Sequence, residues 1–103
     1  MEIFGEYIRK IREQRNMPLR KLAALLDIDQ STLSKIERNE RHFSKELVPK
    51  LSLAFDLNCN KLTVKFLSDR ITYELKDEEQ GIKALKVAEK QIEYFRKKQH
   101  SNG

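Results

Sequence analysis

The chain has 103 residues, enough for one small domain with a single core and perhaps one further helix. Its formal net charge of +5 suits a polyanionic partner, but many ribosomal and membrane-surface proteins share such a charge, so charge alone selects no class. The single cysteine, Cys59, excludes an internal disulfide and a cysteine-rich zinc site, and we expect it to be a semi-buried, unreactive thiol. No apolar run would span a membrane or serve as a signal peptide, so we expect a cytoplasmic protein.

With three glycines, two prolines and scattered strand formers, the composition predicts an all-α fold. The first helix is expected over residues 3–15, because Phe4, Ile8 and Ile11 follow the spacing of one helix face. Arg12 lies directly beside this apolar face, whereas the neighbouring polar residues fall mostly on the solvent side.

Residues 17–41 predict two short helices joined by a tight turn, the arrangement of a helix-turn-helix. The first of these helices has four residues at the spacing of one buried face: Leu19, Leu22, Ala23 and Leu26. The second begins after Asp29, whose carboxylate can accept a hydrogen bond from the N–H of Ser31 or Thr32. Ile28 and Leu33 are spaced to form a hydrophobic staple around this cap.

This segment resembles the helix-turn-helix of the phage repressor and Cro family, the XRE-type group of bacterial and phage regulators. The resemblance rests on the Leu22–Ala23 pair, the polar start at residues 30–32 and the block from Ser34 to Arg38. It covers roughly the first two-thirds of the chain and implies a five-helix DNA-binding domain over residues 1–68. The small size, without a sensor domain, also resembles the controller proteins of restriction–modification systems.

In such a domain, the helix from Gln30 to about Arg38 would enter the major groove by its N-terminal end. Base contacts are expected from Gln30, which can pair with adenine, from Ser31, and from Lys35, which can reach guanine. Phosphate contacts are expected from six polar or basic residues: Arg20, Thr32, Ser34, Arg38, Arg41 and Lys45. The alternative is that the exposed polar face of this helix is an ordinary solvated face that binds nothing.

The resemblance also implies that Arg12 pairs with Glu37 as a structural brace, rather than both being independent surface charges. Two positions depart from the family pattern. Leu19 stands where a phosphate-binding glutamine is common, and Asp27 stands where glycine usually makes the turn. Aspartate tolerates the left-handed conformation, as does Asn39, which closes the recognition helix.

The fourth helix should start after Ser44, and Asn60 should cap the fifth. The fifth helix is expected to run past Ser68, although Ile71, Tyr73 and Leu75 alternate as in a short strand. A last helix is expected from about Glu78 to Gln99, with a stripe through Ile82, Leu85, Ala88 or Glu89, Ile92 and Phe95. This stripe would be buried either against its own domain or against the same helix of a second subunit. Residues 69–99 thus form a C-terminal helical extension, and residues 100–103 a disordered tail.

One recognition helix reads too few base pairs to find a unique site, so we expect a homodimer on palindromic DNA. Either the fifth or the last helix would supply the dimer contact, through Phe66, Ile71, Tyr73, Leu85, Ala88, Ile92 and Phe95. The sequence therefore predicts a transcriptional regulator, more specifically a repressor, that needs no metal or cofactor. The alternative is an antitoxin, whose last helix binds a protein partner while the first domain autoregulates. No catalytic constellation is recognisable, so an enzyme is not expected.

Overall fold

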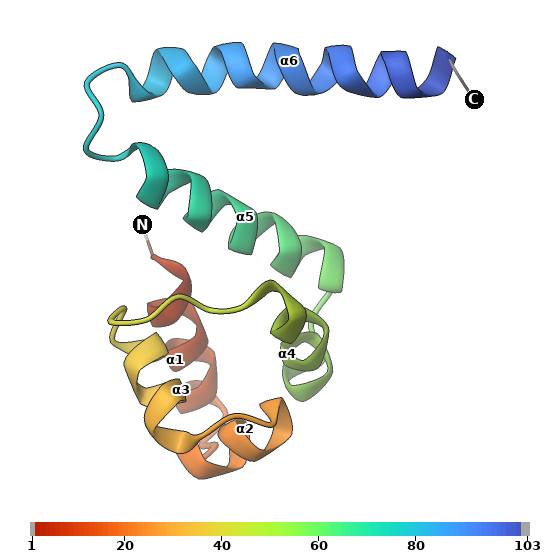
Figure 1. The fold of residues 1–103 in the computed structure, drawn as a ribbon. Coiled ribbons are helices and arrows are strands. Elements are labelled where there is room, and N and C mark those ends of the chain that lie inside the picture. Colours follow the sequence, from red (N-terminus) through yellow and green to blue (C-terminus); the bar gives the residue numbers. More distant parts are fainter. Residues whose placement is uncertain (1, 102–103) are drawn as a thin grey trace. The chain divides into compact units, whose positions relative to one another are not determined.

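The computed structural model describes residues 2–101, which contain helices and loops but no strand, so the predicted all-α fold is confirmed. The chain divides into two compact units, residues 1–70 and 71–103. The helices follow one another along the chain as drawn in Figure 1. Their bounds are α1 (Phe4–Gln14), α2 (Leu19–Leu26), α3 (Gln30–Glu37), the short 3₁₀-helix η1 (Lys45–Leu47), α4 (Val48–Phe55), α5 (Cys59–Leu75) and α6 (Gly81–Ser101).

Each of the first four α-helices is followed within two residues by an asparagine or aspartate in the left-handed conformation. The φ angles are 53° at Asn16, 57° at Asp27, 62° at Asn39 and 52° at Asp56. Their short polar side chains make this region accessible to Asn and Asp at lower cost than to other non-glycine residues. The expected left-handed turns at Asp27 and Asn39 are therefore present, and the chain turns sharply four times without glycine.

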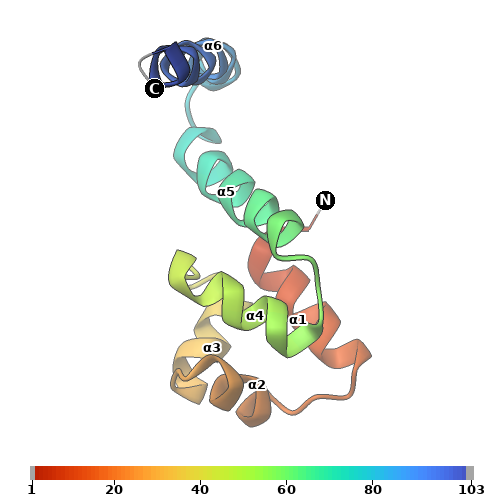
Figure 2. The ribbon, with the colours of Figure 1, turned by 90° about the vertical axis from the view of Figure 1, so that its right-hand side faces the viewer.

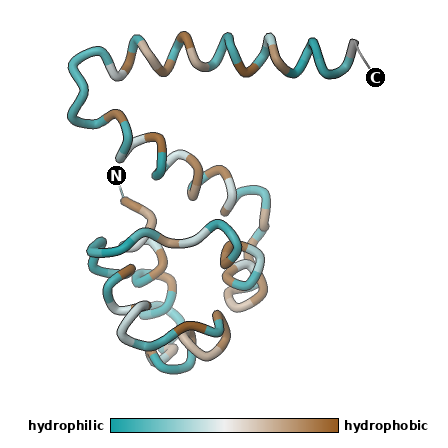
Figure 3. The backbone as a smooth tube through the Cα atoms, in the orientation of Figure 1, coloured by the Kyte–Doolittle hydropathy of each residue, from teal (hydrophilic) through white to brown (hydrophobic). Residues whose placement is uncertain are grey.

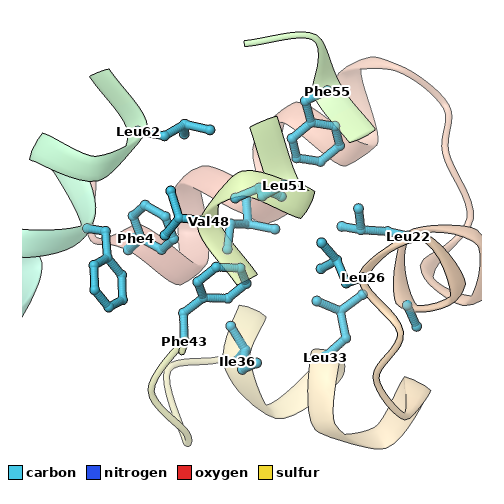
Figure 4. Close-up of a cluster of buried hydrophobic side chains, with 13 residues drawn as sticks. Phe4, Leu22, Leu26, Leu33, Ile36, Phe43, Val48, Leu51, Phe55 and Leu62 are labelled. Carbon is cyan, nitrogen blue, oxygen red and sulfur yellow. The ribbon is translucent and has the colours of Figure 1, made fainter. Parts of the chain in front are cut away.

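A single hydrophobic core fills the first unit, and Figure 4 shows its side chains converging from α1 to α5. Leu22, Leu26 and Leu33 are fully buried at the contact of α2 with α3, which lie next to each other in Figures 1 and 2. Apolar burial of this kind contributes roughly 1.5–3 kcal/mol for each large side chain. The helix-turn-helix therefore rests on the same core as the rest of the unit.

Three phenylalanines close this core at the end opposite the α2–α3 turn. The ring of Phe4 lies with its centroid 5.3 Å from that of Phe43 and 5.8 Å from that of Phe66. Nearby, the backbone N–H of Phe4 donates to the carboxylate of Asp69 at 3.0 Å, so a residue of α5 caps the start of α1. Neither Phe43 nor Asp69 was predicted to have a structural role.

Gly5 allows α1 to approach the C-terminal end of α3 closely. A Cβ at this position would lie 2.2 Å from the carbonyl oxygen of Ile36 and 2.5 Å from Oδ1 of Asn39. The first of these atoms is backbone and cannot move aside without shifting the helix. Glycine is therefore required here for packing.

The structure corrects two expectations about α5. The helix begins two residues earlier than expected, and its cap is Asn58 rather than Asn60, because Oδ1 of Asn58 accepts from the N–H of Lys61 at 3.0 Å. Cys59 is exposed rather than semi-buried, since it occupies the first position of the helix. The expectation that the fifth helix runs past Ser68 is confirmed, because α5 continues to Leu75, so the strand alternative for residues 71–75 is wrong.

The second unit consists of the end of α5, a loop and α6. The predicted last helix exists but is displaced, running from Gly81 to Ser101 instead of 78–99. The predicted disordered tail overlaps α6 at residues 100 and 101, and its last two residues lie outside the described part. Figure 3 shows hydrophobic residues recurring along α6. No helix between residues 2 and 101 is long and apolar enough to cross a membrane.

Candidate nucleic-acid interface

The turn between α2 and α3 consists of Asp27, Ile28 and Asp29. The N–H of Asp27 donates to the carbonyl of Ala24 at 3.1 Å, and that of Ile28 donates to Ala23 at 3.0 Å, which ends α2. Ile28 then packs against the core, as the staple requires, and Asp29 is extended. The turn thereby fixes the direction of α3 relative to α2.

The carboxylate of Asp29 does not form the predicted cap, because α3 has no side-chain hydrogen bond at its N-cap. Asp29 still closes the first helical turn through its carbonyl, which accepts from the N–H of Leu33 at 3.0 Å. The preceding N–H groups, at residues 30–32, have no acceptor among residues 2–101. An uncapped helix N-terminus carries partial positive charge and attracts anions.

The three expected base-contacting residues lie on the exposed side of α3. Gln30, Ser31 and Lys35 are all exposed, while Leu33 and Ile36 hold the other side of the helix in the core. Within residues 2–101, none of the three polar side chains forms a hydrogen bond or an ion pair. Their donors and acceptors are therefore available to a ligand.

The expected phosphate-contacting residues form two groups and two isolated positions. Thr32 is half-buried and lines a shallow hollow with Arg41 beside the α2–α3 turn. Ser34 and Arg38 line a second hollow, at the start of α2, together with Arg9, which the sequence did not suggest. The remaining two, Arg20 in the first turn of α2 and Lys45 in η1, are exposed and line neither hollow.

Two features modify this second hollow. Leu19 forms part of its wall, so an apolar surface occupies the place where the family often has a glutamine. Arg38 is paired with Glu40 at 3.2 Å, but both side chains are 55% exposed. Such an exposed pair contributes little and is readily exchanged for a phosphate.

Arg12 and Glu37 form a bidentate ion pair between α1 and the recognition helix α3. Nε of Arg12 lies 2.8 Å from Oε2 of Glu37, and Nη2 lies 2.9 Å from Oε1. Nη1 donates to the carbonyl of Met17 at 2.9 Å, so one guanidinium links α1, the following loop and α3. The hydrogen bond with Glu37 raises the pKa of Arg12 above its ordinary value, and Arg12 stays charged. This geometry is the one expected of a structural brace between Arg12 and Glu37.

The expected dimer-contact residues do not share one environment. Phe66 is 3% exposed and packs against Phe4 and Phe43 in the core of its own unit, so its side chain is not at the surface of that unit. Ile71 is exposed near the end of α5, and Tyr73 is half-buried. On α6, Leu85, Ile92 and Phe95 are exposed and Ala88 is half-buried.

Comparison with known proteins places this geometry in a family. Residues 8–62, more than half of the chain, match a family described as helix-turn-helix. No curated protein matches the chain. The matched region runs from α1 into α5 and contains the whole α2–turn–α3 arrangement. The chain belongs to the helix-turn-helix family of the XRE type, whose members are DNA-binding transcription regulators.

Proposed function

We propose that this regulator is a repressor that binds a palindromic operator as a homodimer, acting at the nucleoid in the cytoplasm. The observation that carries the proposal is the N-terminal half of α3. Together with Lys35 in its last turn, α3 combines three exposed polar side chains that are unpaired within residues 2–101 with uncapped backbone N–H groups, on a helix that the core and the brace hold in place.

Within this proposal, α3 lies in the major groove and its exposed side chains read bases. The side-chain amide of Gln30 can donate to N7 of adenine and accept from its N6 amino group in a bidentate pair, and the ammonium of Lys35 can donate to guanine O6 or N7. Ser31 stands one turn before Lys35 on the same side of the helix and offers both a donor and an acceptor.

Phosphate contacts would flank this reading surface on both sides. Thr32 and Arg41 share one hollow, and Ser34 and Arg38 share the other. Arg9 has the right charge to join the second group, although its Nε is already bound to Glu13 at 2.9 Å. Contacts of this kind position the protein on the duplex and carry no sequence information.

The homodimer follows from the small number of base pairs that one recognition helix can read. Two copies related by a twofold axis would place their α3 helices about 34 Å apart, one helical turn of DNA. Repression by occlusion requires only that such a dimer binds tightly across a promoter.

The test is to select bound sequences from random duplex DNA and then measure affinity for the selected site. Gln30→Ala and Lys35→Ala should each cost about 1–3 kcal/mol and relax the preference at defined positions. Arg41→Ala should weaken all sequences alike and reduce the salt dependence by about one phosphate contact. Lys61→Ala, which removes an exposed charge on α5, is the control and should change neither property.

Two outcomes would contradict the proposal. If the full chain selects no common sequence, it does not bind an operator. If it selects a sequence without twofold symmetry and Gln30→Ala binds it unchanged, α3 is not the reading element.

A further inference from the structure

Most of the exposed large hydrophobic side chains lie in the last two helices. Among residues 2–100, eleven such side chains are exposed, and nine of them belong to α5 or α6. Six lie on α6, with Phe95 60% and Ile92 55% exposed. Apart from its first residue, Gly81, α6 has no buried side chain up to residue 100. A helix that buries nothing is only marginally stable in water.

These side chains gather on one side of α6. At about 100° per residue, nearly all of its large apolar residues fall within roughly half of the circumference. We call this side the apolar face of α6; it comprises Gly81, Ala84, Leu85, Val87, Ala88, Gln91, Ile92, Tyr94, Phe95, Lys98 and Gln99. The opposite side carries four lysines within a narrow arc: Lys83, Lys86, Lys90 and Lys97.

The distribution of charge on α6 indicates which partner the apolar face would bind. Between residues 81 and 100, Lys98 is the only charged residue on this face, and it lies near the C-terminal end. An acidic partner would be attracted to the lysine side instead. Two apolar faces of α6 can meet along most of their length without bringing like charges together, and both lysine rows would then remain in solvent.

We propose that the apolar face of α6 is a self-association surface whose occupant is α6 of a second copy of this chain. The proposal rests on the homodimer proposed above and assigns its main contact to α6 rather than to α5. The face is wider than the narrow seam of a two-stranded coiled coil. We therefore infer a broad contact between the two α6 helices, with Ile92 and Phe95 within it.

The test compares two charge-changing variants on opposite sides of α6 in the full chain. Ile92→Glu places a carboxylate within the apolar face, and Lys90→Glu, two residues away, makes a larger change of charge on the lysine side. Sedimentation equilibrium over roughly a hundredfold range of concentration gives the dimer dissociation constant. We expect Ile92→Glu to weaken the dimer at least about tenfold and Lys90→Glu to leave it within a factor of about three.

Folding and DNA binding are measured on the same variants. The core of the first unit contains no residue of α6, so the thermal unfolding of that unit should be unchanged in Ile92→Glu. Binding to a single half-site should be retained, whereas cooperative binding to the full palindrome should be lost. If the unaltered chain itself does not bind a half-site, that result counts against operator binding, not against the role of α6.

Two results would overturn the assignment. If Ile92→Glu dimerises as tightly as the unaltered chain, the contact lies elsewhere, with the exposed residues Val64, Leu67 and Ile71 of α5 as the next place to test. If the unaltered chain is monomeric at every concentration, the face does not bind a second copy.

Discussion

The ion pair between Arg12 and Glu37 should be the most sensitive polar contact of the first unit. The side chain of Glu37 is 4% exposed and that of Arg12 is 14% exposed, so water screens the pair only weakly. Removing one partner of a buried pair typically costs about 3–5 kcal/mol, because the other charge is left uncompensated. That loss is a large fraction of the stability of a small domain.

The two single substitutions should differ in cost. Arg12→Ala leaves the more deeply buried carboxylate without a partner, whereas Glu37→Ala leaves a guanidinium that still donates to the carbonyl of Met17. We therefore expect Arg12→Ala to be the more destabilising change, with a loss near the upper end of about 3–5 kcal/mol. Replacing the pair by Arg12→Met with Glu37→Leu should recover most of this loss, because it removes both charges and keeps the volume.

The assay is urea denaturation followed by far-ultraviolet circular dichroism, with all four members of the Arg12/Glu37 alanine cycle. The coupling energy should exceed about 1.5 kcal/mol, the contribution of a hydrogen bond to a charged group. The exposed pair of Arg9 and Glu13, joined at 2.9 Å on the outer side of α1, is the matched control and should show a much smaller coupling. A coupling no larger than that of the control would refute the reasoning that burial makes this pair a brace.

Substitutions at three further positions test local features of the fold by the same measurement. Gly5→Ala should destabilise the first unit by about 1–3 kcal/mol, as overpacking does, because the new methyl group would collide with the carbonyl of Ile36; unchanged stability would mean that α1 shifts without cost. Asn58→Ala should cost about 1 kcal/mol through loss of the cap on the N–H of Lys61, while Asn58→Asp should retain it. At Asp27, with φ of 57°, alanine should be less stable than glycine by about 1–2 kcal/mol; equal stabilities would show that this turn relaxes.

The helix-turn-helix could be predicted from sequence because its signals are local. Apolar spacing defines α2 and α3, and Asp27 and Asn39 mark their ends with residues that tolerate a left-handed backbone. The N-cap hydrogen bond predicted for the Asp29 carboxylate is absent, since the carbonyl of Asp29 alone closes the first turn of α3. The pair of Arg12 with Glu37 depended on the resemblance to a family, because no local pattern joins residues 25 positions apart.

The parts that were missed depend on contacts distant in sequence. Phe43 lies in a polar loop, and nothing near it indicates that its ring packs on Phe4. On α5, apolar residues occur around much of the helix, so spacing could not distinguish the buried Phe66 from the exposed Ile71. An alternating run such as residues 71–75 was compatible with a strand until the continuous helix was known.

The contacts of Phe4 with Phe66 and Asp69 affect when the first unit can complete its folding. They join the first turn of α1 to a part of α5 65 positions later, and all three residues lie outside the matched region 8–62. During synthesis, the emerging chain can form α2 and α3 early, but it cannot complete the aromatic end of its core until residue 69 has left the ribosome. A fragment cut at the family boundaries would lack both sides of this closure, and we expect it to remain partly open even with every DNA-reading residue present.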